Sequence, residues 1–132
     1  MSTRCNIVIK ATDLDNGQRN EWAKVILYHH HDGYPEWMGK RLTEFIENFK
    51  GRDIDDLTNL LLKDKQDAGY EWTNVLHGDI EYLYTIEFQY VPYENAWECD
   101  IVLSYQKVNG GTWDELKFAE SVTLYSRHFD NL

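Results

Sequence analysis

The stretch Tyr-Leu-Tyr-Thr-Ile-Glu-Phe-Gln-Tyr, residues 82–90, decides the fold class of this 132-residue chain. Every second residue from Tyr82 to Tyr90 is aromatic or isoleucine, and the residues between them are mostly polar. Because side chains of a strand point alternately to the two faces of a sheet, this period of two predicts a strand with one buried, aromatic face. The same alternation over 97–105 predicts a second strand, and a third is expected at 118–127.

The N-terminal part of the chain predicts a β-hairpin. Residues 4–11 are rich in β-branched side chains, which favours a strand. Asn16-Gly17 follows, and both residues tolerate the positive φ angles that a type I′ turn requires. The partner strand is expected at 21–31. Its continuous apolar run at 25–27 is typical of a central strand that is covered on both faces.

Two helices are expected between these groups of strands. Apolar residues recur at helical spacing from Met38 to Phe49. Pro35 suits the first turn of this helix, where its missing N–H costs nothing. Asp53 can cap the N-terminus of a second helix, which Gly69 ends.

The expected order of elements is therefore β-β-α-α-β-β-β. Hairpins on either side of a helical pair favour an antiparallel sheet with the helices on one face. We predict a single domain, residues 1–132, of the α+β class. Its two layers are an antiparallel sheet of about five strands and two helices packed on one face of that sheet.

The charge balance narrows the classes of partner. Lys and Arg number 13 and Asp and Glu 23, which gives a net charge of −10, and most of the excess lies in residues 71–132. This balance argues against direct nucleic-acid binding and against docking on an anionic membrane. We expect no membrane span and no signal peptide, because no suitable apolar run occurs. Two cysteines are too few for a disulfide framework, so we expect a cytoplasmic protein.

The densest cluster of chemically active side chains is His29-His30-His31-Asp32. Strand alternation would place His29 and His31 on one face, a spacing that suits metal ligation. The candidates for a third ligand are Asp32, His77, Asp79 and His128. The alternative is structural, because Asp32-Gly33 can turn the chain into the helix and the carboxylate is stabilised near the helix N-terminus. No cofactor is our expectation, and a divalent metal at His29, His31 and Asp32 is the alternative.

The same region carries a recognisable pattern. Tyr28, His30 and the run Asp-Gly-Tyr-Pro at 32–35 read Tyr-x-His-x-Asp-Gly-Tyr-Pro. This pattern resembles a stretch of small uncharacterised proteins of bacteria and their phages, in which a Tyr-His segment also leads into an amphipathic helix. The resemblance runs from the end of the second expected strand through the first expected helix. It implies a bacterial or phage origin and no particular activity.

Aromatic residues make up 14% of the chain, and some of them fall at the ends of expected elements. Exposed Trp and Tyr among polar groups are typical anchors of recognition surfaces, although the same residues can cover core edges under loops. We therefore predict a binding site formed by His29, His31, Asp32, Tyr34 and Trp37, where the second strand turns into the first helix.

Three functions are compatible with these features. The first is a non-catalytic, acidic and phage-encoded binding protein that acts by protein–protein interaction, for example by inhibiting a basic, nucleic-acid-binding host-defence protein. The second is a small-ligand or nucleotide binder with a pocket near the first helix, where Arg41, Arg52 or Arg127 meets a phosphate. The third is a metal-dependent enzyme that uses His29, His31 and Asp32. We favour the first. An uncovered edge of the C-terminal sheet is also compatible with a homodimer, and the sequence leaves the oligomeric state open.

Overall fold

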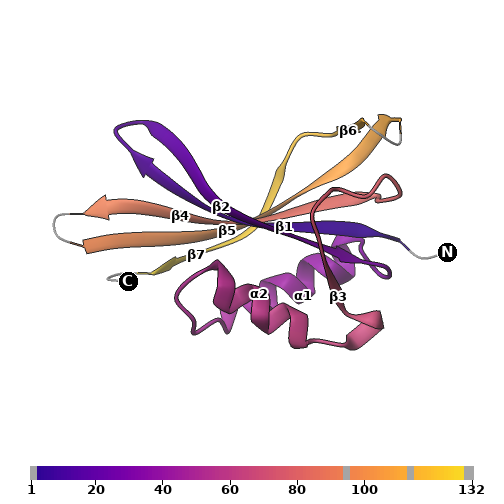
Figure 1. The fold of residues 1–132 in the computed structure, drawn as a ribbon, viewed down its shortest axis with the longest axis horizontal. Helices are drawn as coiled ribbons and strands as arrows, with labels where there is room; N and C mark the ends of the chain where they lie inside the picture. The colour runs from indigo at the N-terminus through magenta and orange to yellow at the C-terminus, as the bar shows by residue number, and fades with distance from the viewer. Residues whose placement is uncertain (1–2, 94–95, 113–114, 130–132) are drawn as a thin grey trace.

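The computed structural model describes residues 3–93, 96–112 and 115–129. Figure 1 shows one long, twisted sheet with the helices gathered on one side of it. The strands are β1 (Cys5–Asp15), β2 (Gln18–His29), β3 (Tyr70–Thr73), β4 (Tyr82–Tyr93), β5 (Ala96–Gly111), β6 (Leu116–Phe118) and β7 (Val122–Phe129). The helical segments are η1 (Pro35–Gly39), α1 (Lys40–Glu47), α2 (Ile54–Lys63) and η2 (Gln66–Ala68).

The sheet is mixed. Its strand order is β3-β2-β1-β4-β5-β6, and β7 pairs with β5 as well. β1 and β4 are parallel, whereas the other pairs of strands in the described ranges are antiparallel. The chain therefore leaves the first hairpin, passes through the helices and returns beside β1.

The predicted fold class, a two-layer α+β fold with an antiparallel sheet of about five strands, is wrong. The sheet has seven strands and is mixed, because β4 pairs with β1 in parallel and joins the two groups of strands. β3 has only four residues and β6 only three, so neither is long enough to show a period of two in the sequence. The single strand expected at 118–127 is replaced by β6 and β7.

The N-terminal hairpin is confirmed. Asp15 pairs with Gln18 across the turn, and Asn16 and Gly17 have φ angles of 51° and 75°. These are the positive values that a two-residue hairpin turn requires. The partner strand ends at His29, two residues before the expected end.

This hairpin contains a β-bulge that the sequence pattern did not predict. Thr12 pairs with Glu21, but its neighbour Ala11 pairs with Ala23. Trp22 is therefore an extra residue on β2. Since the side-chain period of a strand is two, the extra residue exchanges the two faces of β2 on either side of it.

Both predicted helices form, but the first is divided into η1 and α1, and α2 ends at Lys63, before the expected end at Gly69. Met38, Leu42 and Ile46 are fully buried, which confirms the apolar stripe of the first helix. Asp53 caps α2, because its Oδ1 accepts a hydrogen bond of 3.0 Å from the backbone N–H of Asp56. None of the helices in the described part of the chain is long and apolar enough to cross a membrane.

The main core lies between the helices and one face of the sheet. Cys5 and Cys99 are buried in it as free thiols. The opposite face, here called the open face, bears a smaller cluster around Tyr28, Ile80 and Leu83. α1 and α2 lie on the other side of the sheet from the open face (Figure 1).

Candidate functional site

The predicted binding residues lie where β2 runs into η1, and His29 is the most buried of them. It is fully buried, and its Nδ1 lies 2.5 Å from the backbone carbonyl oxygen of His31. Its ring packs against Trp37 and Tyr70, at centroid distances of 5.9 and 4.8 Å. His29 is thus part of the core on the helical side of the sheet.

His31, in contrast, is exposed and lies beyond the end of β2. The alternation that would place both imidazoles on one face therefore stops at His29, and this reason for a shared site is wrong. Among the described residues, no group of three or more His, Cys, Asp or Glu side chains could hold a metal ion. A metal at His29, His31 and Asp32 stays a prediction.

The Asp-Gly turn fixes the entry to the first helix. Asp32 adopts a positive φ of 51°. The Gly33 N–H donates to the Thr3 carbonyl at 2.8 Å, and the Gly33 carbonyl accepts from the Tyr84 hydroxyl at 2.7 Å. A Cβ at Gly33 would lie only 2.9 Å from that of Cys5, so this position needs glycine. The turn is hydrogen-bonded to the segment before β1 and to β4, which explains its residues structurally.

Tyr34 and Trp37 belong to the first helical turn. Tyr34 is partly exposed, and its carbonyl accepts hydrogen bonds from the N–H groups of Trp37 and Met38, at 3.1 and 2.9 Å. Trp37 is half-buried and packs against the main core. The structure brings His31 and Trp37 together around the buried ring of His29.

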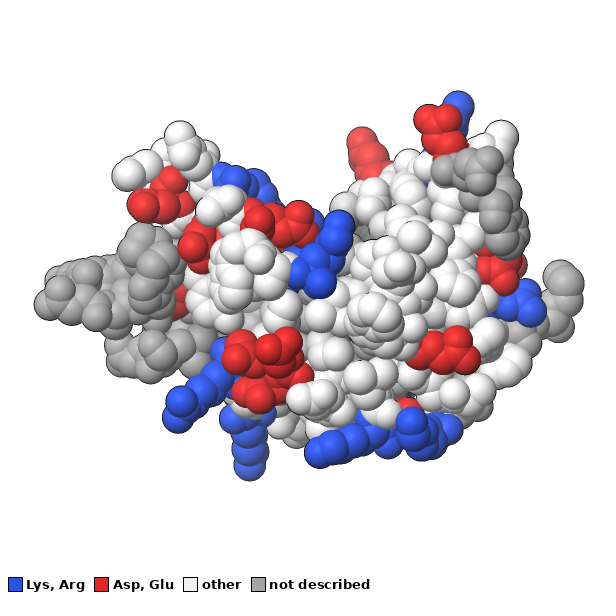
Figure 2. Space-filling view, in the orientation of Figure 1, with Lys and Arg blue, Asp and Glu red and all other residues white. Residues whose placement is uncertain are grey.

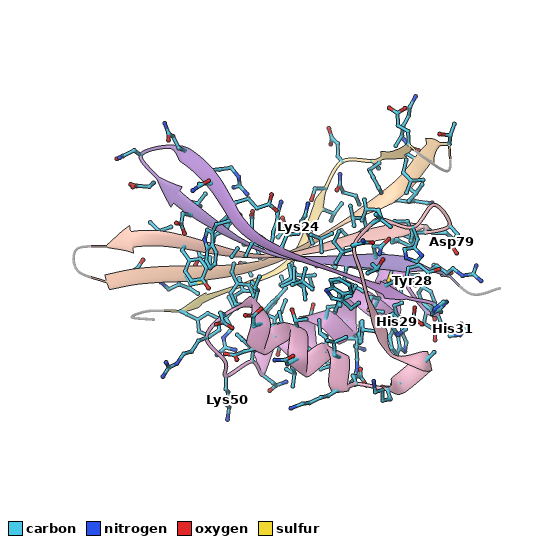
Figure 3. The ribbon with its side chains drawn as sticks, in the orientation of Figure 1. Lys24, Tyr28, His29, His31, Lys50 and Asp79 are labelled. Carbon is cyan, nitrogen blue, oxygen red and sulfur yellow. The ribbon has the colours of Figure 1, made fainter. Side chains whose placement is uncertain are left out.

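An accessible hollow lies on the open face. Figure 2 shows a recess in the upper margin of the molecule, between two raised parts that correspond in Figure 1 to the β1–β2 hairpin and the β6 region. Lys24 lies at its floor (Figure 3). This groove has a volume of about 280 Å³. Its lining residues are Val8, Lys10, Glu21, Lys24, Ile26, Leu76, Leu83, Thr85 and Gln106.

Strand register arranges the open face at and beside the groove in two rows across β2, β1 and β4. One row is charged and consists of Lys24, Lys10 and Glu87. The next row is largely apolar and consists of Ile26, Val8 and Thr85. A ligand in the groove would therefore meet cationic groups along one side and aliphatic side chains along the other.

The bulge at Trp22 places Lys24 in this groove. With no extra residue in β2, Lys10 would lie opposite Ala23, and Lys24 would lie opposite Ile9 on the core side of the sheet. With the bulge, Lys10 and Lys24 are direct cross-strand partners. Directly opposite residues point to the same face, so both ammonium groups are on the open face.

Glu87 ends the charged row and is only 7% exposed. Its carboxylate accepts hydrogen bonds from Thr12 at 2.8 Å, Arg19 at 2.5 Å and Gln89 at 2.7 Å. Lys10 lies farther away, with 3.8 Å between Nζ and Oε2. Burial alone would raise the pKa of Glu87, but the three hydrogen bonds and the Arg19 charge bring that pKa below its ordinary value. Glu87 is thus ionised at neutral pH.

A second polar network holds the segment between β3 and β4, which forms one wall of the groove. The Tyr28 hydroxyl donates to the Asp79 carboxylate, with distances of 2.8 and 3.0 Å to its two oxygens, and Arg4 Nε lies 3.3 Å from the same carboxylate. The His77 ring stacks on Tyr28 at 3.9 Å, and its backbone N–H donates to Asn6 at 2.8 Å. Burial, and to a smaller extent the hydrogen bond to Asp79 and the negative charge of Asp79, raise the pKa of Tyr28. This wall is therefore built of groups that already have partners.

Another hollow, of about 300 Å³, lies between α1 and α2, near the place favoured by the sequence for a ligand pocket. Arg41, Phe45 and Leu60 are among its lining residues. The Arg41 guanidinium lies over Phe45 and pairs with Asp64 at 3.1 Å. Arg127 donates to backbone carbonyls at the end of α1. Both arginines thus have protein partners where a phosphate was expected.

No groove residue was among the predicted binding residues. The available signal was a lysine beside each apolar run of the hairpin, Lys10 after Ile9 and Lys24 before Val25. Only the bulge brings these two lysines opposite each other. Comparison of this chain with protein-family models, with curated proteins and with solved structures found no match.

Proposed function

We propose that this chain is a non-catalytic binding protein that holds a small molecule in the groove of its open face. The carrying observation is that one hollow combines an aliphatic floor with a row of charged side chains. Small-molecule sites typically measure roughly 300–1,000 Å³ and combine apolar walls with a few polar groups that fix orientation. The groove, at about 280 Å³, lies just below this range and suits a small ligand.

The hypothesis that this acidic chain binds a basic protein has less support. It depends on the acidic residues gathering on one face, because a continuous acidic surface is what steers a basic protein. On the face in Figure 2, Asp and Glu occur in several separate groups, with Lys and Arg between them. A basic protein partner, a phage origin and a homodimer stay predictions, and the groove is the better-supported site.

Filling the groove tests the proposed function. Thr85 is the β4 member of the apolar row and lines the groove, so the indole of a Thr85→Trp variant would occupy the groove. The probe is 1-naphthamide, a neutral aromatic molecule whose binding is followed by calorimetric titration. We expect Thr85→Trp to weaken binding at least about tenfold, because the ligand loses most of its apolar contact.

The matched control is Asn59→Trp, which adds the same side chain at an exposed position of α2. It should bind the probe as the unaltered protein does. Urea unfolding of both variants shows that each is folded. Unchanged affinity in a folded Thr85→Trp variant would contradict the proposed function.

A further inference from the structure

The cross-strand pair Lys10–Lys24 is the least expected feature of the groove. Like charges directly opposite each other on neighbouring strands are destabilising. The chain has an excess of acid, with 23 Asp and Glu against 13 Lys and Arg, so two facing lysines run against its general composition. The bulge at Trp22 is the structural feature that creates this pair.

The protein supplies little counter-charge to the pair. The acidic neighbour of Lys10 is Glu87, at 3.8 Å, and Glu87 forms its shorter contacts with Arg19, Thr12 and Gln89. Lys24 is exposed and takes part in none of the ion pairs formed by the described residues. The one acidic residue that lines the groove with them is Glu21.

We propose that the ligand of the groove is a small organic anion with an apolar body. Its carboxylate or phosphate lies between the ammonium groups of Lys10 and Lys24, and its apolar part lies on Val8, Ile26 and Leu83. This inference rests on the proposed function and adds the chemical class of the ligand. An anion placed there relieves the repulsion of the lysine pair, and the adjacent aliphatic row accounts for the apolar body.

A purely structural role for the lysines gives a different expectation. Lysine stems can cover apolar surface while their ammonium groups stay in water, and the pair would then keep the open face hydrated. In that case the groove would show no preference for an anion. The two explanations are separated by comparing ligands that differ in charge but not in shape.

The experiment uses three probes with the same ring system: 1-naphthoate, 1-naphthyl phosphate and neutral 1-naphthamide. Calorimetric titration at neutral pH and low salt gives their affinities for the full chain. We expect the tighter-binding anion to be preferred over 1-naphthamide by about fivefold or more, as for a charge pair at a partly exposed site. The order of carboxylate and phosphate identifies the anionic group.

Lys24→Glu removes the cation and turns the lysine pair into an opposite-charge pair. We expect this variant to lose the preference for the anion, while its midpoint of urea unfolding stays the same or rises without ligand. Lys50→Glu makes the same change in net charge at an exposed residue between α1 and α2, remote from the groove (Figure 3). It should keep the preference.

The outcomes separate this inference from the proposed function. Equal affinities for the anions and for 1-naphthamide would overturn the anion proposal and leave binding in the groove intact. An equal loss of preference in Lys24→Glu and Lys50→Glu would also overturn it, because net charge alone would then be responsible. Absence of binding by all three probes at millimolar concentration would contradict both proposals.

Discussion

Glu87 is a carboxylate held at low exposure on the face of the sheet that the helices leave uncovered. Its ionised form is stabilised by donors from three positions, Thr12, Arg19 and Gln89. Removing the charged acceptor leaves the buried Thr12 hydroxyl and the Arg19 charge without this partner, which costs more than an average hydrogen bond contributes. The stability of the hairpin against β4 is thus linked to one titrating group.

We predict that Glu87→Gln lowers the free energy of unfolding at pH 7 by about 1–3 kcal/mol, because the charged acceptor is lost. The pKa of Glu87 in the folded protein is below its ordinary value, so the unfolded state takes up the proton first as the pH falls. The contribution of Glu87 is present above the unfolded-state pKa and is lost as the pH falls through the folded-state pKa. The difference between the unaltered protein and Glu87→Gln should therefore shrink on acidification.

Urea unfolding at a series of pH values from 7 downward measures this difference. Glu21→Gln is the matched control, because Glu21 is an exposed carboxylate on β2 that forms no ion pair with the described residues. A difference for Glu87→Gln that stays constant or grows as the pH falls would show that the Glu87 charge does not stabilise the fold.

At the scale of elements, the last strand holds the first helix in place. Arg127 of β7 donates from Nη1 to the backbone carbonyls of Ile46, Glu47 and Phe49, at 2.8, 2.8 and 2.9 Å. The final carbonyls of a helix have no partner within the helix, and the negative end of the helix dipole attracts a cation there. This contact spans most of the chain and fixes α1 against the sheet.

We predict that Arg127→Ala lowers the free energy of unfolding by about 1–3 kcal/mol, through the loss of a charged donor to several carbonyls. Arg52→Ala is the control, since Arg52 is an exposed arginine in the connection between α1 and α2. Equilibrium unfolding in urea gives both values. Equal, small effects of the two substitutions would mean that the contact from β7 does not stabilise α1.

The elements also show how far the sequence could predict the fold. The Asn16-Gly17 turn, the buried stripe from Met38 to Ile46 and the Asp53 cap follow from local rules and are confirmed. The bulge at Trp22 does not follow from local rules. The position of one extra residue in a strand depends on which partners the two faces of β2 contact, and these partners are far away in the sequence. Because the sequence pattern does not predict the bulge, it does not predict that Lys10 and Lys24 face each other, and it therefore does not predict the groove.

For the whole molecule, the decisive feature is the parallel pairing of β1 with β4. Cys5 pairs with Tyr82 and Asp13 with Tyr90, far apart in sequence, and no local pattern specifies such a contact. This pairing makes the sheet mixed and brings the lysines of the hairpin beside Glu87 and Thr85 of β4. The sequence predicts a site at the histidine cluster because its residues are adjacent in the chain, but the fold buries His29 and leaves His31 exposed.

The central claim is that the groove on the open face is the ligand site. Isotope-filtered NMR on labelled protein with 1-naphthoate, the probe that carries a carboxylate, tests it most directly. We predict intermolecular NOEs from the naphthyl protons to the methyl groups of Val8, Ile26 and Leu83, which line the groove. NOEs to Phe45 and Leu60, which line the hollow between α1 and α2, with none to the groove methyls, would contradict the claim.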